Sequence, residues 1–210
     1  MNKDIMICGV GGQGTVLASR IIAASAMEEG FTGHSAETIG MAQRGGPVTS
    51  HVRIGDQAFS PLIPVGGADL LIAFEPSEAV RNLKYLKKDG FVIVNRIPVK
   101  PTSLNGGAEY DGKAEIDFIR SKCRCLVVDS DELCAPFGSP KFFNVAVLGA
   151  ALGSGELGLK EETVRNTIIK IVPERFTEKN LAALTAGMNV TSRGGACSSR
   201  LQSGVGDANR

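Results

Sequence analysis

Short apolar segments alternate with helix-forming segments along the chain, and this pattern restricts the fold more than any other feature. Residues 68–74 (ADLLIAF) and 91–94 (FVIV) are almost continuously apolar, as is typical of strands buried on both faces. Strands and helices that alternate in this way form right-handed crossover units. We therefore predict an α/β fold, with a single Rossmann-like domain whose mostly parallel sheet carries helices on both faces.

Periodicity and helix-boundary residues place the individual elements. Strands are predicted at residues 4–8, 31–36, 48–54, 68–74, 91–94 and 125–128. Helices are predicted between residues 15 and 30 and at residues 76–86, 115–122, 144–152, 161–171 and 176–186. After this domain at residues 1–188, the Gly- and Ser-rich residues 189–210 lack apolar periodicity, so we expect them to form a disordered and dispensable tail.

The charge balance and the absence of long apolar segments exclude several classes of protein. The chain has 23 Lys and Arg against 22 Asp and Glu, so no strong field attracts nucleic acid or an anionic membrane. It also lacks both a signal-peptide core and the roughly 18 consecutive apolar residues of a membrane span. We expect a cytoplasmic protein with no nucleic-acid or membrane partner.

The cysteines predict neither a disulfide framework nor a metal site. Their number is odd, their spacing is irregular, and none forms the Cys-x-x-Cys runs that hold zinc or iron–sulfur clusters. They are Cys8, Cys123, Cys125, Cys134 and Cys197. We predict reduced, buried thiols and no bound metal.

A glycine-rich segment follows the first strand and opens the first helix. Its spacing is that of a dinucleotide fingerprint, in which exposed backbone N–H groups and the helix dipole hold a phosphate. The same spacing also suits a simple anion site or a tight strand-to-helix turn, and Glu37 is the candidate acid for a ribose hydroxyl. The candidate binding residues are Gly9, Gly11, Gly12, Gln13 and Gly14.

A second glycine-rich segment, residues 37–47, is predicted to be a loop because it has four glycine or proline residues and few apolar residues. An arginine in such a loop can contact a carboxylate or phosphate in bidentate fashion, although a solvated surface loop is the alternative. The candidate residues are Gly40, Gln43, Arg44, Gly45 and Gly46. His34 and His51 lack further metal ligands nearby in sequence, so we interpret both as ordinary strand histidines.

Six short motifs in register resemble one known family. The chain is similar to the γ-type small subunits of 2-oxoacid:ferredoxin oxidoreductases, and most similar to the small subunit, called β, of indolepyruvate:ferredoxin oxidoreductase. The likeness extends over about residues 4–187. The motifs are residues 9–15 (GVGGQGT), 40–46 (GMAQRGG), 50–53 (SHVR), 60–64 (SPLIP), 74–76 (FEP) and 144–149 (NVAVLG).

This resemblance implies a subunit that is inactive alone. A large partner subunit would carry thiamine diphosphate and iron–sulfur clusters, coenzyme A would capture the acyl group, and ferredoxin would accept the electrons. The two glycine-rich segments would line the partner's active site or approach the coenzyme A phosphates, and no residue of this chain is expected to be catalytic. Two other hypotheses remain open, a stand-alone Rossmann-type NAD(P)-binding module or reductase, and a structural homo-oligomer.

Overall fold

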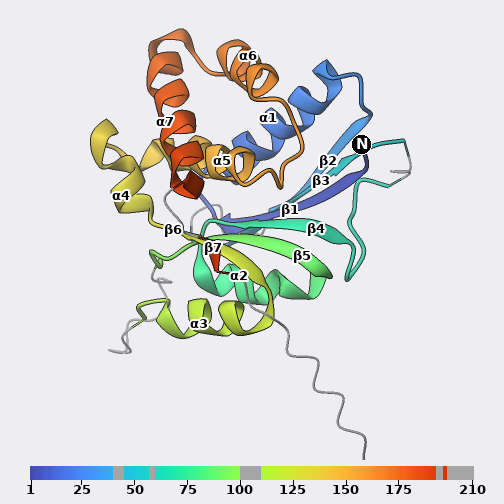
Figure 1. The fold of residues 1–210 in the computed structure, drawn as a ribbon, viewed down its shortest axis with the longest axis vertical. Helices are drawn as coiled ribbons and strands as arrows, with labels where there is room; N and C mark the ends of the chain where they lie inside the picture. Colours follow the sequence, from blue (N-terminus) through green and yellow to red (C-terminus); the bar gives the residue numbers. More distant parts are fainter. Residues whose placement is uncertain (40–44, 57–59, 100–109, 193–195, 198–210) are drawn as a thin grey trace, which may run out of the picture.

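The computed structural model describes residues 1–39, 45–56, 60–99, 110–192 and 196–197. Within these residues, seven strands form one sheet in the order β2-β3-β1-β4-β5-β6-β7 (Figure 1). The strands are β1 (Lys3–Val10), β2 (Gly33–Ile39), β3 (Pro47–Ile54), β4 (Ala68–Ala73), β5 (Leu86–Asn95), β6 (Arg124–Val128) and β7 (Ala196–Cys197).

The strands β1, β4, β5 and β6 are parallel to one another and form the centre of the sheet. Strand β3 is antiparallel to β1, β2 is antiparallel to β3, and β7 is antiparallel to β6. Parallel neighbours need a crossover connection, whereas β2 and β3 are consecutive in the chain and pair antiparallel. The predicted α/β class is confirmed, with antiparallel strands added at both edges of the parallel centre.

Helices cover both faces of the sheet, as predicted. The helices α1 (Thr15–Glu28), α5 (Phe143–Gly153), α6 (Glu161–Ile171) and α7 (Glu174–Ser192) lie on one face, and α2 (Pro76–Asn82) and α3 (Lys113–Lys122) lie on the other (Figure 1). The short α4 (Ser130–Cys134) follows β6. Three 3₁₀ turns complete the described elements: η1 (Leu83–Tyr85), η2 (Ala135–Phe137) and η3 (Pro140–Phe142).

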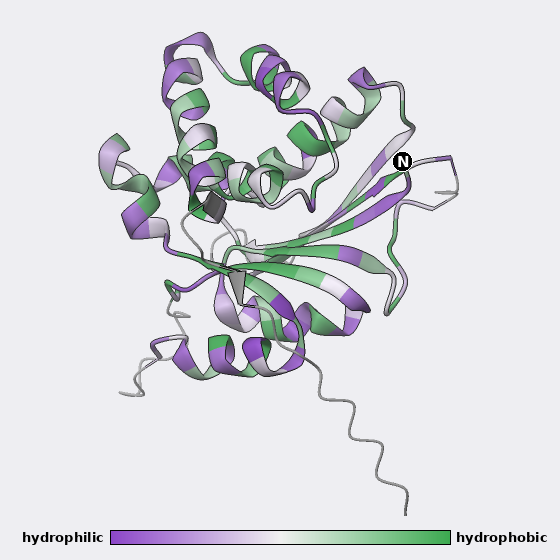
Figure 2. Cartoon of the chain, viewed as in Figure 1, coloured by the Kyte–Doolittle hydropathy of each residue, from purple (hydrophilic) through white to green (hydrophobic). Residues whose placement is uncertain are grey.

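The core consists of two apolar layers, one on each side of the sheet. In β1, Ile5 and Ile7 join the layer under α1 and α5, whereas Met6 and Cys8 join the layer under α2 and α3. Alternate side chains of a strand point to opposite faces, so an unbroken apolar sequence is what a doubly covered strand requires. Figure 2 shows these hydrophobic strands between helices whose outer surfaces are more polar.

The packing of α5 against α7 fixes the start of α5 near the first glycine-rich segment. A Cβ atom on Gly149 would lie 2.0 Å from the Leu184 carbonyl oxygen, and one on Gly187 would lie 1.8 Å from the Ala146 carbonyl oxygen. Only glycine permits such a close approach of two helix backbones. Because α5 is also apolar almost all round, it is a buried core helix that holds Asn144 in place.

The ends of two helices and the start of the predicted tail differ from the sequence-based expectations. The predicted helix at residues 76–86 ends at Asn82 and continues as η1, and α7 extends past the boundary expected at Met188. Val190 packs against the core, and β7 lies in the predicted tail, where it extends the sheet beside β6. The predicted disorder of residues 198–210 falls outside the described residues and stays a prediction. None of the described helices is long and apolar enough to cross a membrane.

Candidate functional site

The first glycine-rich segment forms a tight turn between β1 and α1. Gly12 and Gly14 have φ angles of 100° and 83°, which side chains other than glycine rarely adopt. Gly14 is the N-cap of α1, and neither a side-chain cap nor an acidic residue occupies the first helical turn. The N–H groups at the start of α1 therefore remain available to an anion, and the helix dipole favours negative charge there.

The Gln13 side chain holds this turn closed. Its Oε1 accepts a hydrogen bond from the Val10 N–H at 2.8 Å, and its Nε2 donates to the Phe74 carbonyl oxygen at 3.1 Å. A Cβ atom on Gly9 would lie 2.6 Å from the same Oε1, so glycine is needed for this arrangement. The turn is thus tied to the end of β4, and Gln13 is engaged with backbone rather than pointing free into solvent.

The structure places the described end of the second glycine-rich segment beside the first. The Gly11 N–H donates to the Gly46 carbonyl oxygen at 2.9 Å, and Val10 lies opposite Pro47 in the β1–β3 ladder. Gly45 immediately precedes this contact. The other predicted contacts of this segment, Gly40, Gln43 and Arg44, lie outside the described residues, and their roles stay predictions.

Two polar side chains that sequence reasoning missed connect the ends of the parallel strands. Asn95, at the end of β5, donates through Nδ2 to the carbonyl oxygen of Phe74 and to Ser130 Oγ, both at 3.2 Å. Its Oδ1 accepts from the Ser130 N–H at 3.1 Å. These bonds fix the ends of β4, β5 and β6 relative to one another. Neither Asn95 nor Ser130 belongs to a recognisable sequence motif.

A cleft of about 360 Å³ opens where these elements meet. It lies at the carboxyl ends of β1, β5 and β6, the usual position of ligands in open α/β sheets. Asn144 reaches it from α5, and a Cβ atom on Gly14 would lie 2.6 Å from the Asn144 Nδ2. The motif at residues 144–149 was the sequence signal for this residue. The polar and glycine lining comprises Gly12, Gln13, Gly14, Asn95, Ser130, Asp131, Lys141 and Asn144.

A buried polar cluster lies on the other side of the sheet, beneath α2. Glu75 caps α2 by accepting a hydrogen bond from the Glu78 N–H at 2.9 Å, and the Tyr110 hydroxyl donates to Glu75. Burial raises the pKa of Glu78, although its ion pair with Arg81 acts in the opposite direction. Burial, reinforced by the two glutamates, also raises the pKa of Cys8 well above its ordinary value. Cys8 is therefore a neutral thiol and a poor nucleophile.

Four of the five cysteines, Cys8, Cys123, Cys125 and Cys134, are confirmed as buried side chains. Burial raises the pKa values of Cys123 and Cys134 to about 11, and Cys125 is fully buried in the sheet. A thiolate, not a thiol, is the metal ligand and the nucleophile. Among the described residues, no three His, Cys, Asp or Glu side chains are grouped in a way that could hold a metal ion.

Both histidines lie in strands, as predicted. His34 is in β2 opposite Arg53, and His51 is in β3 opposite Ala36. The buried His51 accepts a hydrogen bond at Nδ1 from the Ile63 N–H at 3.1 Å, and burial lowers its pKa. His51 therefore contributes to packing as a neutral ring.

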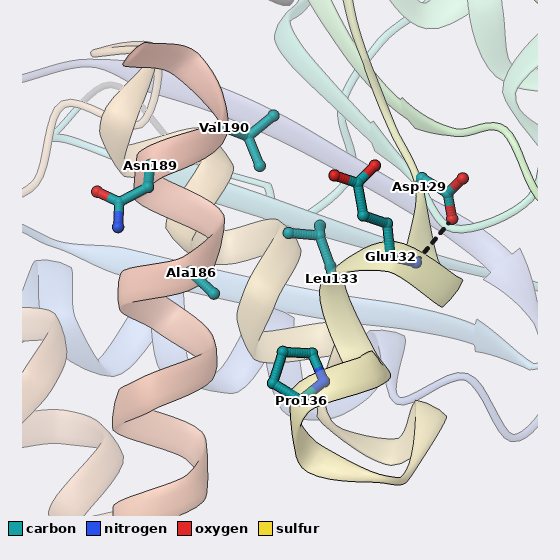
Figure 3. A pocket seen from close by; sticks show the side chains of 7 residues that line it. All are labelled: Asp129, Glu132, Leu133, Pro136, Ala186, Asn189 and Val190. Carbon is teal, nitrogen blue, oxygen red and sulfur yellow. Dashed lines mark hydrogen bonds between the residues drawn. The ribbon is translucent and has the colours of Figure 1, made fainter. Parts of the chain in front are cut away.

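A separate cleft of about 420 Å³ lies between α4 and the C-terminal half of α7 (Figure 3). Asp129 caps α4 by accepting hydrogen bonds from the N–H groups of Asp131 and Glu132, and it also pairs with Arg96. Burial alone would raise the Asp129 pKa, but these hydrogen bonds and the arginine charge lower it overall. Asp129 and Glu132 line this cleft, and no lysine or arginine is among its described lining residues, so it is unsuited to a phosphate.

The geometry does not support the dinucleotide-binding alternative. In that fold the strand after the first helix lies parallel beside β1 and ends in the acid that binds the ribose. Here the neighbours of β1 are β4 and the antiparallel β3, and the strand after α1 is β2, which carries Glu37 at the edge of the sheet. The Glu37 carboxylate also accepts a hydrogen bond from Ser19 Oγ at 3.1 Å.

Comparison with known proteins adds the decisive observation, because a family model for pyruvate ferredoxin/flavodoxin oxidoreductase matches residues 4–190. The chain belongs to this family. It is 41% identical over 192 residues to the indolepyruvate oxidoreductase subunit IorB of Archaeoglobus fulgidus, covering 90% of this chain and 95% of that protein. It is 34% identical over 189 residues to the IorB of Pyrococcus horikoshii, with 88% and 94% covered. The resemblance predicted from the six motifs is confirmed.

Solved structures share the fold. The pyruvate oxidoreductase subunit PORC of Thermotoga maritima superposes with a TM-score of 0.67 at 23% identity, covering 90% of this chain and 96% of that one. A 2-oxoglutarate:ferredoxin oxidoreductase from Magnetococcus marinus gives a TM-score of 0.63 at 18% identity. There the match covers 92% of this chain but 30% of the other, so the same fold forms one part of a longer polypeptide.

Proposed function

We propose that the chain is the small, cofactor-free subunit of a 2-oxoacid:ferredoxin oxidoreductase that acts on indolepyruvate or another aryl pyruvate. The observation that carries this proposal is the 41% identity, over 90% of the chain, to a protein named as an indolepyruvate oxidoreductase subunit. The family match over residues 4–190 supports the oxidoreductase class independently of that one relative.

The proposed division of labour places the redox chemistry on a large partner subunit. Thiamine diphosphate and iron–sulfur clusters on the partner would supply decarboxylation and electron transfer. Per turnover, one 2-oxoacid and one coenzyme A give one acyl-coenzyme A, one carbon dioxide and one proton, and two ferredoxins are each reduced by one electron. The buried cysteines of this chain, whose pKa values are raised at Cys8, Cys123 and Cys134, fit a subunit that holds no cluster.

The contribution of this chain would come from the cleft beside the first glycine-rich segment. The uncapped N–H groups of α1 and the Lys141 ammonium offer positive electrostatic potential there, the Asp131 carboxylate opposes it, and Asn144 contributes a carboxamide. Arg44 and Gln43, in the segment that ends at the Gly11–Gly46 contact, would add side-chain donors. We infer that this surface binds the coenzyme A phosphates or closes the partner's active site.

The experiment replaces Arg44 in the complex reconstituted from both subunits. Arg44→Ala should lower turnover about tenfold or more, because a charge-assisted hydrogen bond to a phosphate or carboxylate contributes about 1.5 to 3 kcal/mol. Arg44→Lys should recover part of this loss, since an ammonium cannot form the planar bidentate contact. Arg20→Ala, which removes an exposed arginine of α1, is the matched control and should retain wild-type turnover.

The measurement is viologen reduction with indolepyruvate, thiamine diphosphate and coenzyme A, with kcat and the KM for coenzyme A determined separately. Wild-type turnover for Arg44→Ala would contradict a role of the second segment at the active site. A purified chain that binds NADH tightly, or that is yellow or brown, would instead favour the reductase alternative.

A further inference from the structure

A third cleft, of about 550 Å³, lies on the α1 and α7 side of the molecule, next to the cleft of the proposed function. It is bounded by the turns η2 and η3, by the start of α1, and by the connection from α6 into α7. Phe137 and Phe142 contact each other edge to face, with ring centroids 5.9 Å apart, and Phe176, which is 40% exposed, also lines the cleft. Three of the nine phenylalanines of an aromatic-poor chain thus line one cleft.

The charged lining of this cleft is entirely positive. Lys141 comes from η3, and Arg175 and Lys179 are four residues apart on α7, so the latter two lie on the same helix face. Within the part of the chain that the structure describes, no aspartate or glutamate lines the cleft, and no ion pair involves these three side chains. The Arg175 guanidinium lies 4.8 Å from the Phe176 ring centroid, and the Lys179 ammonium 6.0 Å from that of Phe142.

Two buried carboxamides and the Ser139 hydroxyl complete the polar lining. Asn180 is 6% exposed and its Nδ2 donates to the Phe176 carbonyl oxygen at 2.8 Å. Asn144 is 5% exposed, and it lines both this cleft and the cleft beside the first glycine-rich segment. The remaining wall consists of Gly138 and the apolar side chains of Leu17, Ile171, Val172 and Pro173, together with the three aromatic rings.

We propose that this cleft binds a small aromatic carboxylate, with the ring between the phenylalanines and the carboxylate at Lys141, Arg175 and Lys179. Its size lies within the range of small-molecule sites, and half of its lining is apolar. A guanidinium pairs with a carboxylate in a planar, bidentate manner. A nucleotide fits less well, because its base and sugar present many polar groups and the wall offers few partners beyond two carboxamides and the Ser139 hydroxyl.

The proposed aromatic carboxylate site shares residues with the cleft of the proposed function. Lys141 and Asn144 line both clefts, and η3 forms the wall between them. A ligand that draws the Lys141 ammonium toward its carboxylate removes that charge from the neighbouring cleft. Occupancy should therefore weaken anion binding beside the first glycine-rich segment, which makes the site a point of regulation by an aryl acid.

The test is calorimetric titration of the purified full-length chain with indole-3-acetate, so it does not depend on whether the proposed function is correct. Binding of one molecule per chain is expected, and the neutral isostere indole-3-acetamide should bind at least tenfold more weakly. The double variant Arg175→Gln/Lys179→Gln should also lose at least tenfold in affinity. The matched control is Lys84→Gln/Lys122→Gln, which removes two exposed ammonium groups that lie 5.3 and 5.5 Å from aromatic ring centroids elsewhere. It should bind within twofold of wild type.

Four results would overturn the proposal. The amide could bind as well as the acid, or the double variant could bind like wild type, and either would mean that the charges play no part. Indoxyl phosphate could bind more than tenfold tighter than indole-3-acetate, and the ligand class would then be a phosphate. Finally, if neither the isolated chain nor the reconstituted complex binds indole-3-acetate at millimolar concentration, the cleft is not a ligand site.

Discussion

Substitution of Gly14 by alanine tests whether the start of α1 and the start of α5 are coupled at the site. Gly14 has a φ angle of 83°, and a non-glycine residue in the left-handed region costs about 1 to 2 kcal/mol. The new Cβ would also lie 2.6 Å from the Asn144 Nδ2, so the carboxamide must move. Its Oδ1 accepts a hydrogen bond from the Val145 N–H at 2.9 Å, and loss of that bond adds about 1 kcal/mol.

Gly12→Ala is the matched control for this change. Gly12 has a φ angle of 100°, but a Cβ there would have no atom within 4 Å, so only the backbone cost applies. For a chain of this size, 1 kcal/mol corresponds to about 2 to 4 °C in Tm. Gly14→Ala should therefore melt about 2 to 4 °C below Gly12→Ala when both are measured by differential scanning calorimetry.

A double-mutant cycle shows whether the extra cost arises from the carboxamide. Asn144→Ala removes the colliding group, so its effect combined with Gly14→Ala should be about 1 kcal/mol smaller than the sum of the single effects. Combined with Gly12→Ala it should be additive. Equal melting temperatures for the two glycine variants, or additivity in both cycles, would refute the coupling.

Three further predictions concern the body of the subunit. Burial raises the pKa of Glu78 in the folded state. The stability contributed by the protonated Glu78 is therefore fully present below the pKa of the unfolded chain, and it is lost as the pH rises through the pKa of the folded state. Urea unfolding should show Glu78→Gln close to wild type at pH 4 and more stable than wild type at pH 8, and an unchanged difference would contradict this. A chain ending at Met188 loses Val190 and β7 and should be less stable by about 2 kcal/mol, whereas one ending at Cys197 should melt within about 2 °C of the full chain. Gly14→Val should impair folding more than Cys125→Ser does. Cys125→Ser should leave the iron content of the purified complex unchanged, and a loss of iron would assign Cys125 to a metal site.

The sequence was sufficient for the elements whose patterns are local. An almost continuous apolar run predicted β4 because the strand is covered on both faces, and helical periodicity predicted α6 at its observed bounds. The antiparallel placement of β3 beside β1 could not be predicted in this way, because alternation identifies a strand but not its neighbour. The docking of β7 beside β6 was missed for the same reason, since two residues carry no periodicity.

The candidate site was predictable only where glycine geometry defines it. The turn at residues 9–14 has a recognisable spacing, but no sequence pattern indicates that Gln13 hydrogen-bonds to the backbone at Val10 and Phe74. Asn95 and Ser130 lie 35 residues apart and meet only because parallel strands end at one edge of the sheet. Such contacts follow from strand order, which local patterns do not contain.

The most direct test of the proposed function is an activity measurement with three samples: this chain alone, the partner subunit alone, and the two combined. Each receives indolepyruvate, thiamine diphosphate, coenzyme A and a viologen acceptor, and viologen reduction is followed at equal protein concentration. The proposal predicts that this chain alone is inactive and that coenzyme A-dependent reduction requires the mixture. Substantial reduction by this chain alone, or a mixture no more active than the partner alone, would contradict the assignment.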